Sequence, residues 1–246
     1  MPMVTFAPIA MDIAPDILAR GQLQMEGQVT WGSNFTFLVQ VCHEDAVIDA
    51  IYKPQRGERP LWDFATGTLC HRERAAYLLS EAAGWSLVPL TLLRDGPYGY
   101  GAVQLFIDHD PEAHYFTFEG QFPDQLQRIV LFDYVVNNAD RKSGHVLRDG
   151  TDRLWAIDHG VCFHEQYKLR TVIWEFAGQP ISSLLQGELV ELQRRIEATD
   201  DLVITELQTL LAPGEWVQMR RRLQKLLDTG TFPVPGRGRP YPWPLV

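Results

Sequence analysis

Apolar residues in the first hundred positions recur at the two-residue period of half-buried β-strands. This pattern predicts five strands, over residues 22–29, 35–41, 47–52, 87–93 and 102–107. The third strand runs into Lys53-Pro54, and proline cannot continue the ladder of a central strand, so we expect this strand to end there. The strands follow one another through short polar turns, which predicts a small antiparallel sheet.

Helical periodicity marks the remaining apolar stretches. It predicts helices over residues 13–20, 70–83, 124–138, 183–198, 200–211 and 215–227. The order of elements is that of an α+β protein with two lobes, and no linker separates independent domains. We expect one domain over residues 1–246, with a sheet lobe carrying one helix at about 20–107, a reduced and mainly helical lobe at about 108–232, and an extended tail at 233–246.

Amino-acid composition and net charge argue against several classes of function. A net charge of -9 argues against a general binder of nucleic acid or of anionic membranes, although a local basic site stays possible. Three cysteines without a CxxC pair indicate reduced thiols rather than a disulfide frame. The first residues lack the basic start of a signal peptide, and no apolar run approaches the roughly 20 residues of a membrane span. These features predict a cytoplasmic protein.

Two acids follow apolar runs in the middle of the chain. Asp140 lies in a polar cluster after residues 131–136, and Asp158 follows the run 154–157 eighteen residues later. Two carboxylates delivered to one place suit metal-assisted phosphate chemistry, in which one acid handles the nucleophile and the other holds the ion. The alternative is two ordinary polar turns, because aspartate, asparagine and glycine are common turn formers.

Earlier residues offer partners for these acids. Lys53 at the end of the third strand can place a positive charge on phosphates, and Glu73 in the following helix can reach back to hold it. The turn at 30–34 can bring the Ser33 hydroxyl and backbone N–H groups to an anion. Each has a plainer alternative: a solvated lysine, an exposed helical acid and a simple hairpin turn.

The order of these parts resembles the phosphatidylinositol 3- and 4-kinase superfamily of atypical kinases. The segments RERAAYLLSEAAGWSLVPLT and WAIDHGVCFHE are similar to type II-like phosphoinositide 4-kinases of plants and bacteria, with small bacterial relatives as the nearest likeness. The specific part is Asp140-Arg141 followed by Asp158-His159-Gly160, and the likeness covers most of residues 22–180. It implies a two-lobed protein-kinase-like fold that uses ATP and a divalent metal, Mg²⁺ or Mn²⁺.

The resemblance also implies roles for individual residues. Asp140 would accept the proton of an attacking hydroxyl, Asp158 would bind the metal, and Arg141 would belong to the catalytic group. The nucleotide would be held by Lys53, supported by Glu73, by the turn at Ser33 and Asn34, and by the hinge strand from Gln104 to Phe106. The partners are thus a nucleotide and an unidentified hydroxyl acceptor, which can be a lipid headgroup, a protein or a small molecule.

His145 stands where the family has an asparagine as second metal ligand. Imidazole ligates Mn²⁺ or Zn²⁺, whereas Mg²⁺ prefers oxygen, so His145 predicts an altered metal preference, an ion held mainly by Asp158, or degraded catalysis. Two other hypotheses therefore stay open. One is a pseudokinase that binds a nucleotide or a partner without phosphoryl transfer. The other is a metal-dependent hydrolase centre made of Asp140, His145, Asp158, His159 and His164.

Overall fold

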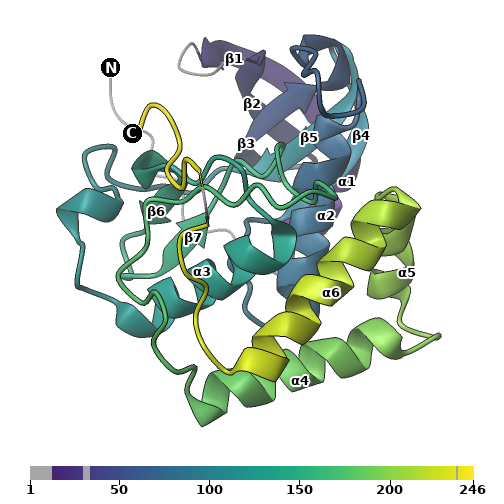
Figure 1. Ribbon diagram of the computed structural model, residues 1–246. Coiled ribbons are helices and arrows are strands. Elements are labelled where there is room, and N and C mark those ends of the chain that lie inside the picture. Colours follow the sequence, from purple (N-terminus) through teal and green to yellow (C-terminus); the bar gives the residue numbers. More distant parts are fainter. Residues whose placement is uncertain (1–12, 30–33, 237) are drawn as a thin grey trace. The chain divides into compact units, whose positions relative to one another are not determined.

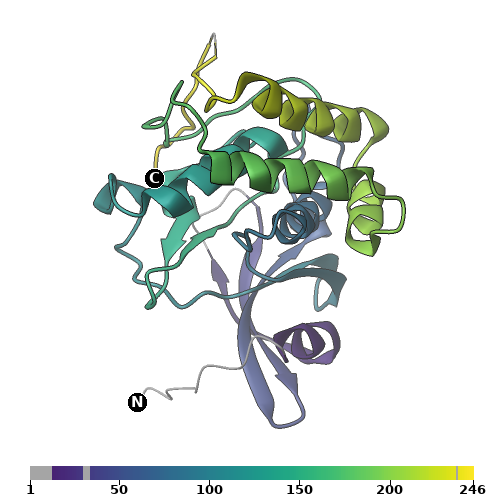
Figure 2. The ribbon, with the colours of Figure 1, turned by 90° about the horizontal axis from the view of Figure 1, so that it is seen from below.

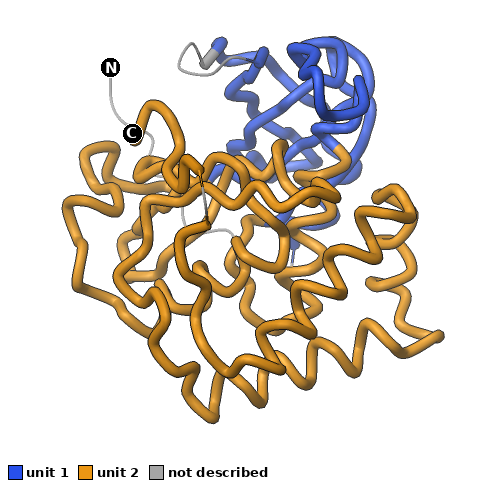
Figure 3. The backbone as a smooth tube through the Cα atoms, viewed as in Figure 1, with its two compact units in different colours: residues 1–70, 90–106 blue, residues 71–89, 107–246 orange. Residues whose placement is uncertain are grey.

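The computed structural model describes residues 13–29, 34–236 and 238–246. The chain divides into two compact units, each described by itself (Figure 3). Unit 1 comprises residues 1–70 and 90–106, and unit 2 comprises residues 71–89 and 107–246. The change of unit after Phe106 lies next to the expected lobe boundary, but residues 71–89, which we expected in the sheet lobe, belong to unit 2.

Unit 1 is built on a five-stranded sheet with the order β1-β2-β3-β5-β4, and every neighbouring pair is antiparallel (Figure 1). The strands are β1 (Gln22–Val29), β2 (Thr36–His43), β3 (Ala46–Pro54), β4 (Thr91–Gly96) and β5 (Gly99–Leu105). All five predicted strands are confirmed, and β3 ends at Pro54 as expected. The last two differ from the predicted ranges by two to four residues at their ends. The two strands extend further toward each other than predicted because the hairpin turn between Gly96 and Gly99 is tighter than its polar composition indicated.

Helix α1 (Ala14–Arg20) lies against one face of this sheet (Figure 2). Its buried Ile17 and Leu18 pack with apolar side chains of β2, β3 and β5, which form the core of unit 1. Gly101 faces the end of β3, where an added Cβ would come within 2.3 Å of the Lys53 carbonyl oxygen. Only glycine allows this close approach, which sets where β5 passes the predicted phosphate-binding lysine.

Unit 2 is mainly helical. Its helices are α2 (Leu69–Ala82, of which the first two residues belong to unit 1), α3 (Pro123–Val136), α4 (Ser183–Glu197), α5 (Leu202–Thr209) and α6 (Pro213–Thr229). Helices α4 and α6 run side by side in Figure 2, and α3 also packs against α6. The apolar side of α2 joins this helical core, which explains why residues 71–89 group with unit 2.

A short hairpin of β6 (Val146–Arg148) and β7 (Leu154–Ala156) lies between α3 and α4 in the sequence. Together, the antiparallel sheet and the helical unit confirm the predicted α+β class. Residues 233–246 contain no helix or strand among those described. No helix in the described ranges is long and apolar enough to cross a membrane.

Candidate active site

The loop that carries Asp140 begins where α3 ends. Asn137 adopts a left-handed conformation with φ 55°, which asparagine tolerates better than most residues, and its N–H still bonds back to α3. Its side-chain amide donates to the carbonyls of His164 (2.9 Å) and Gln166 (2.7 Å) and accepts the N–H of Lys168 (2.8 Å). Asn137 therefore ends the helix and ties the loop to residues 164–168.

Asn138 fixes the backbone of Asp140. Its side-chain oxygen accepts the Asp140 N–H (2.9 Å), and its amide nitrogen donates to Asp133 Oδ1 (3.0 Å). Asp133 and Asn138 are both fully buried. A buried side-chain acceptor holds a backbone N–H in one orientation because breaking the bond would leave both groups without a partner. The position of Asp140 is thus set by the end of α3.

Arg141, which we expected among the catalytic residues, has its guanidinium occupied by contacts within unit 2, and its role in catalysis stays a prediction. Its guanidinium is fully buried and donates to both carboxylate oxygens of Asp133 (2.9 Å each). The other donors reach the carbonyls of His145 (2.9 Å) and Ile157 (2.7 Å) and the ring of His159 (2.7 Å). All five N–H groups of an arginine are then used within unit 2, so none is left for a substrate.

Asp158 lies just beyond β7, in a left-handed conformation with φ 61°. The next N–H, that of His159, donates to Glu73 Oε2 of α2 at 3.0 Å, and both groups are buried. A charged acceptor makes a strong hydrogen bond to a backbone N–H. Glu73 therefore holds the turn that presents Asp158, a role that the resemblance did not suggest.

His145 bridges the two acid-bearing segments. Its Nδ1 lies 3.0 Å from the carbonyl oxygen of Asp140, and its Nε2 lies 3.3 Å from Asp158 Oδ2. A carbonyl only accepts, so Nδ1 carries a proton, and Nε2 either donates a second proton to the Asp158 carboxylate or, in the neutral ring, presents a lone pair to it. Two such acceptors stay close only with a proton or a metal ion between them. Anchoring one ring nitrogen on a carbonyl is also typical of metal-ligating histidines, so this pair fits a divalent ion.

The hydrolase alternative finds no centre of its own. Among the residues described, no group of three or more histidine, cysteine or acidic side chains is arranged to hold a metal. His159 is buried against Arg141, and His164 Nδ1 accepts the N–H of Gln166 (3.0 Å). These two histidines have structural contacts, so the predicted five-residue metal centre is not formed.

Asp140 is electrostatically unusual. Burial of the Asp140 carboxyl raises its pKa from 3.8 to about 6; nearby Lys142 lowers it, Asp158 raises it, and Arg170 lowers it by a smaller amount. Lys142 Nζ lies 3.6 Å from Asp140 Oδ2, and the carboxyl is 33% exposed. A carboxylate with a pKa near neutrality is suited to accept a proton from an alcohol, because a general base works best close to the working pH.

The predicted nucleotide-binding residues of unit 1 occupy defined places. Lys53 pairs with Ala102 across β3 and β5, and Asn34 Oδ1 accepts the N–H of Arg59 (2.7 Å). The predicted pairing of Lys53 with Glu73 joins the two units and stays a prediction. Ser33 lies outside the described residues.

Several hydrogen-bonding groups of the predicted hinge stretch, from Gln104 to Phe106, already have partners within unit 1. Gln104 is buried with its amide on Thr91 Oγ1 (2.7 Å), and the N–H of Phe106 donates to the Asp49 carbonyl (3.0 Å). The N–H of Leu105 donates to the carbonyl of Leu90, just before β4 (2.8 Å). The predicted adenine contact cannot use these two N–H groups, which leaves carbonyl groups of this stretch as the proposed contact.

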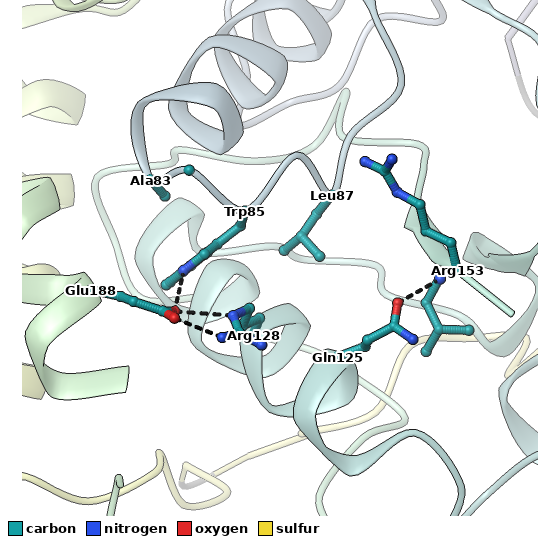
Figure 4. Close-up of a pocket in the computed structure, with 9 residues that line it drawn as sticks. Ala83, Trp85, Leu87, Gln125, Arg128, Arg153 and Glu188 are labelled. Carbon is teal, nitrogen blue, oxygen red and sulfur yellow. Dashed lines mark hydrogen bonds and ion pairs between the residues drawn. The ribbon is translucent and has the colours of Figure 1, made fainter. Parts of the chain in front are cut away.

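A pocket of about 300 Å³ lies elsewhere in unit 2, lined by residues of the α2–β4 connection, α3, β7 and α4 (Figure 4). At one side the Glu188 carboxylate accepts from Trp85 Nε1 (2.7 Å) and from Arg128 (2.6 Å). These bonds lower the pKa of Glu188 despite its burial. Neither candidate catalytic acid lines this pocket, and the pair of Arg128 and Glu188 holds α3 to α4.

Sequence reasoning missed three contributors to the site, Asp133, Asn138 and Arg170, and it considered His159 only as part of the motif and as a metal ligand of the hydrolase alternative. Asp133 had a signal, since it is an acid on the otherwise apolar face of the predicted helix at 124–138. An acid at such a position indicates a buried cationic partner. Arg170 had none, because its effect on Asp140 depends on how residues 166–172 fold back onto the loop.

Comparisons with known proteins identify a family and a fold. A family model described as phosphatidylinositol 3- and 4-kinase matches residues 71–193, which include Glu73, Asp140, His145 and Asp158. Protein Rv2133c of Mycobacterium tuberculosis (strain ATCC 25618 / H37Rv) is 36% identical over 274 residues, covering 96% of this chain and 98% of that protein. Phosphatidylinositol 4-kinase gamma 4 of Oryza sativa subsp. japonica is 32% identical over 122 residues, covering 42% of this chain and only 22% of the rice protein.

Solved structures share the fold at low identity. The structure of hydra Fam20 with sugar matches with a TM-score of 0.53 and 12% identity, covering 87% of this chain and 86% of that one. The Helicobacter pylori proinflammatory kinase CtkA matches with a TM-score of 0.50 and 11% identity, covering 86% and 93%. These likenesses confirm a kinase-like fold. With the family model spanning the acid-bearing segments and a mycobacterial relative aligned almost end to end, the chain belongs to the phosphatidylinositol 3- and 4-kinase family.

Proposed function

We propose that this protein is an ATP-dependent phosphotransferase that moves the γ-phosphoryl group to a hydroxyl. The observation that carries the proposal is the site of unit 2, in which His145 contacts both the Asp140 backbone and the Asp158 carboxylate. The acceptor oxygen bonds to the γ-phosphorus, its proton passes to the Asp140 carboxylate, and ADP leaves. Positioning of the reacting groups and neutralisation of the phosphate charge supply most of the rate enhancement in such transfers.

Asp140 acts as the base in this scheme. Its carboxyl has a pKa of about 6, so it is mostly ionised at neutral pH yet more basic than an ordinary aspartate. Lys142, 3.6 Å from the carboxylate, also offers a positive charge where the phosphoryl group and its acceptor meet. That charge favours the transition state, in which negative charge spreads over the phosphoryl oxygens.

A divalent ion, when bound, neutralises the charge of the nucleotide phosphates. Asp158 and His145 would hold it, and Lys53, steadied by Glu73, would hold the phosphates directly. Asn34 and Ser33 would belong to the phosphate turn, and the stretch from Gln104 to Phe106 would contact adenine. Because one of the two ligands is an imidazole, we expect Mn²⁺ to bind better than Mg²⁺.

The metal assignment is tested by His145→Asn in the purified protein without nucleotide. Manganese binding, followed by the electron paramagnetic resonance signal of free Mn²⁺, should weaken about 10- to 100-fold, while Mg²⁺ binding changes little. His43→Asn is the matched control, because His43 Nε2 also lies near an aspartate, 3.5 Å from Asp16 Oδ2, in unit 1. Equal manganese binding by the wild type and His145→Asn would remove His145 from the metal site.

The acceptor is the open part of the proposal. Relatives named phosphatidylinositol 4-kinases make a lipid headgroup the first acceptor to test, with protein hydroxyls and small alcohols alongside. This chain covers 33% or less of the plant kinases of rice and Arabidopsis thaliana cited for this, so their substrates are transferred only as candidates. A cytoplasmic location, where ATP is available, belongs to the same proposal.

The activity itself is tested with radiolabelled ATP, Mg²⁺ or Mn²⁺, and vesicles, proteins or polyols as acceptors. Transfer by the wild type that is lost in Asp140→Asn, with nucleotide binding kept in a thermal-shift titration, supports the kinase. Nucleotide binding without transfer under either metal would establish the pseudokinase instead. If no nucleotide shifts the melting temperature, both versions fail.

A further inference from the structure

The pocket of Figure 4 has a lining that the proposed phosphoryl transfer does not use. Its volume of about 300 Å³ lies at the lower end of the range for small-molecule sites. Its apolar part is made by Trp85 and Leu87 of the α2–β4 connection and by Leu154 of β7. A cavity of this size between apolar side chains accommodates a small organic molecule.

Most polar groups of the lining already bond to one another or to the backbone. The Glu188 carboxylate accepts from Trp85 Nε1 (2.7 Å) and from Nε and Nη2 of Arg128 (3.0 and 2.6 Å). The Gln125 amide bonds to two backbone groups of the segment that ends in β7. The charges of Arg128 and Glu188 cancel, so this side of the pocket has a fixed shape but does not select a charged ligand.

Arg153 is the exception. Its guanidinium lies over the Trp155 ring, 3.8 Å from the centroid, and its Nη2 donates to the Ser86 carbonyl (2.6 Å). Figure 4 shows it on the side of Leu87, away from the pair of Arg128 and Glu188. Among the residues that the structure describes, no carboxylate forms an ion pair with this guanidinium. The ring and the carbonyl fix its orientation, so its other N–H groups are prepared for an anion.

We propose that this pocket binds a small organic anion in which one carboxylate or phosphate group is attached to an aromatic ring. The anionic group pairs with the guanidinium of Arg153, whose planar donors match both kinds of oxyanion. The ring lies among Trp85, Leu87 and Leu154, where it removes apolar surface from water. A bare ion such as inorganic phosphate would leave this apolar part of the pocket unfilled.

The same wall is hydrogen-bonded to the strand that leads to Asp158. The N–H of Ala156 in β7 donates to the Leu87 carbonyl (2.8 Å), two residues before Asp158. The N–H of Leu87 in turn donates to Ser80 Oγ of α2 (2.7 Å), and α2 carries Glu73, which holds the turn that presents Asp158. A bound ligand therefore stabilises two elements that position the proposed metal ligand. Only this coupling rests on the proposed function; binding in the pocket does not.

Binding is tested on the full chain labelled with 5-fluorotryptophan, without metal or nucleotide, by fluorine NMR during titration with benzoate or phenyl phosphate. The Trp85 signal, assigned by its absence in Trp85→Phe, should shift with a dissociation constant on the order of 1 mM, the scale for a ligand of about ten heavy atoms. The signal of Trp62, which is 93% exposed in unit 1, should not move. Benzyl alcohol, which has the ring without the charge, should bind about tenfold more weakly.

Arg153→Gln removes the positive charge and should weaken the binding of both anions about tenfold or more, the scale of a charge-assisted hydrogen bond. Arg148→Gln is the matched control, because Arg148 is a half-buried arginine of the same hairpin that does not line the pocket. It should bind like the wild type. No shift of the Trp85 signal, equal binding of benzyl alcohol, unchanged affinity in Arg153→Gln or an equal loss in Arg148→Gln would overturn the proposal.

The coupling is tested by titration with Mn²⁺, followed by electron paramagnetic resonance, with and without saturating benzoate. Benzoate should tighten Mn²⁺ binding about fivefold or more in the wild type and leave it unchanged in Arg153→Gln. A shift of the Trp85 signal without a change in Mn²⁺ affinity would refute the coupling alone. Absence of Mn²⁺ binding in every sample would refute the proposed metal site, while the Trp85 signal still decides whether the pocket binds the anion.

Discussion

Replacing Asp140 with asparagine is expected to abolish phosphoryl transfer and to stabilise unit 2. The carboxylate is the proposed base, so its loss removes proton acceptance. The same carboxylate is unfavourable for folding, because burial raises its pKa to about 6 from an ordinary 3.8. Asparagine keeps the shape and the backbone bond from Asn138 but carries no charge to desolvate.

The size of the effect follows from the change in pKa. The difference between 3.8 and about 6 corresponds to at most about 3 kcal/mol in the free energy of unfolding at neutral pH. Because the Asp140 side chain is 33% exposed, solvent screens part of this cost. We therefore expect Asp140→Asn to raise the free energy of unfolding by about 1–2 kcal/mol.

The stabilisation has a defined pH window. Folded protein keeps the Asp140 proton up to a pH of about 6, whereas unfolded protein releases it near 3.8. Between these values the folded state binds more protons, so the stability of the wild type falls as pH rises through the window and then levels off. The gain in free energy of unfolding from Asp140→Asn is thus absent below the pKa of the unfolded state. It grows as pH rises through the window and is constant above a pH of about 6.

Urea unfolding of both proteins at a series of pH values, followed by tryptophan fluorescence, measures this difference. Asp149→Asn is the control with the opposite sign. Burial opposes ionisation of Asp149, but hydrogen bonds from Trp155, Thr151 and Arg153 outweigh it and lower the pKa of Asp149. Its contribution is present above the ordinary pKa and lost as pH falls through the lowered value, so Asp149→Asn should destabilise at neutral pH.

One pattern would refute the reasoning for Asp140. If Asp140→Asn destabilises the protein at neutral pH, or changes its stability equally at every pH, the carboxylate is not desolvated in the folded state. Loss of transfer together with lower stability would mean that the substitution damaged the loop, and the base assignment would lose its support.

Three further predictions concern the groups that support the site. Arg141→Lys should lower the free energy of unfolding by about 3 kcal/mol or more, since it breaks a buried pair with Asp133, and circular dichroism melting checks this. Glu73→Gln weakens the acceptor for the His159 N–H and should reduce turnover more than nucleotide binding, measured by separating kcat from KM. Ser143→Pro removes the N–H that holds the tail, yet proline suits the first position of the short 3₁₀ turn there; it should cost only about 1 kcal/mol and speed hydrogen exchange in residues 240–246.

The elements of the fold could be read from periodicity, but their grouping could not. Alternation and helical spacing located all five strands of the sheet and the helices of unit 2, because each buries one face. The same pattern cannot say which core covers that face. Helix α2 follows β3 in the chain, and its apolar side packs in unit 2 with α3 and α6. Strand β6 has only three residues, too few for alternation to show.

The two acids of the site could be predicted from the sequence, whereas the groups that hold them in position could not. Asp140 and Asp158 stand out because each follows an apolar run and matches a family motif. The role of Arg141 depends on Asp133, eight residues earlier on α3, and on carbonyl groups that no motif records. A motif gives the identity of a residue, while its contacts decide whether that residue touches substrate or holds the loop.

The contacts of Arg141 also explain how a short loop can hold a desolvated carboxylate. One Nη1 group donates to the carbonyls of both His145 and Ile157, the residues at and immediately before the two proposed metal ligands. The distance between His145 and Asp158 is therefore set by a guanidinium that is itself fixed on Asp133. This anchor is buried and fully bonded. Contacts that take no part in phosphoryl transfer therefore offset the unfavourable free energy of burying the Asp140 carboxylate. We infer that substitutions at Asp133 would disturb metal binding through Arg141 and the placement of Asp140 through Asn138.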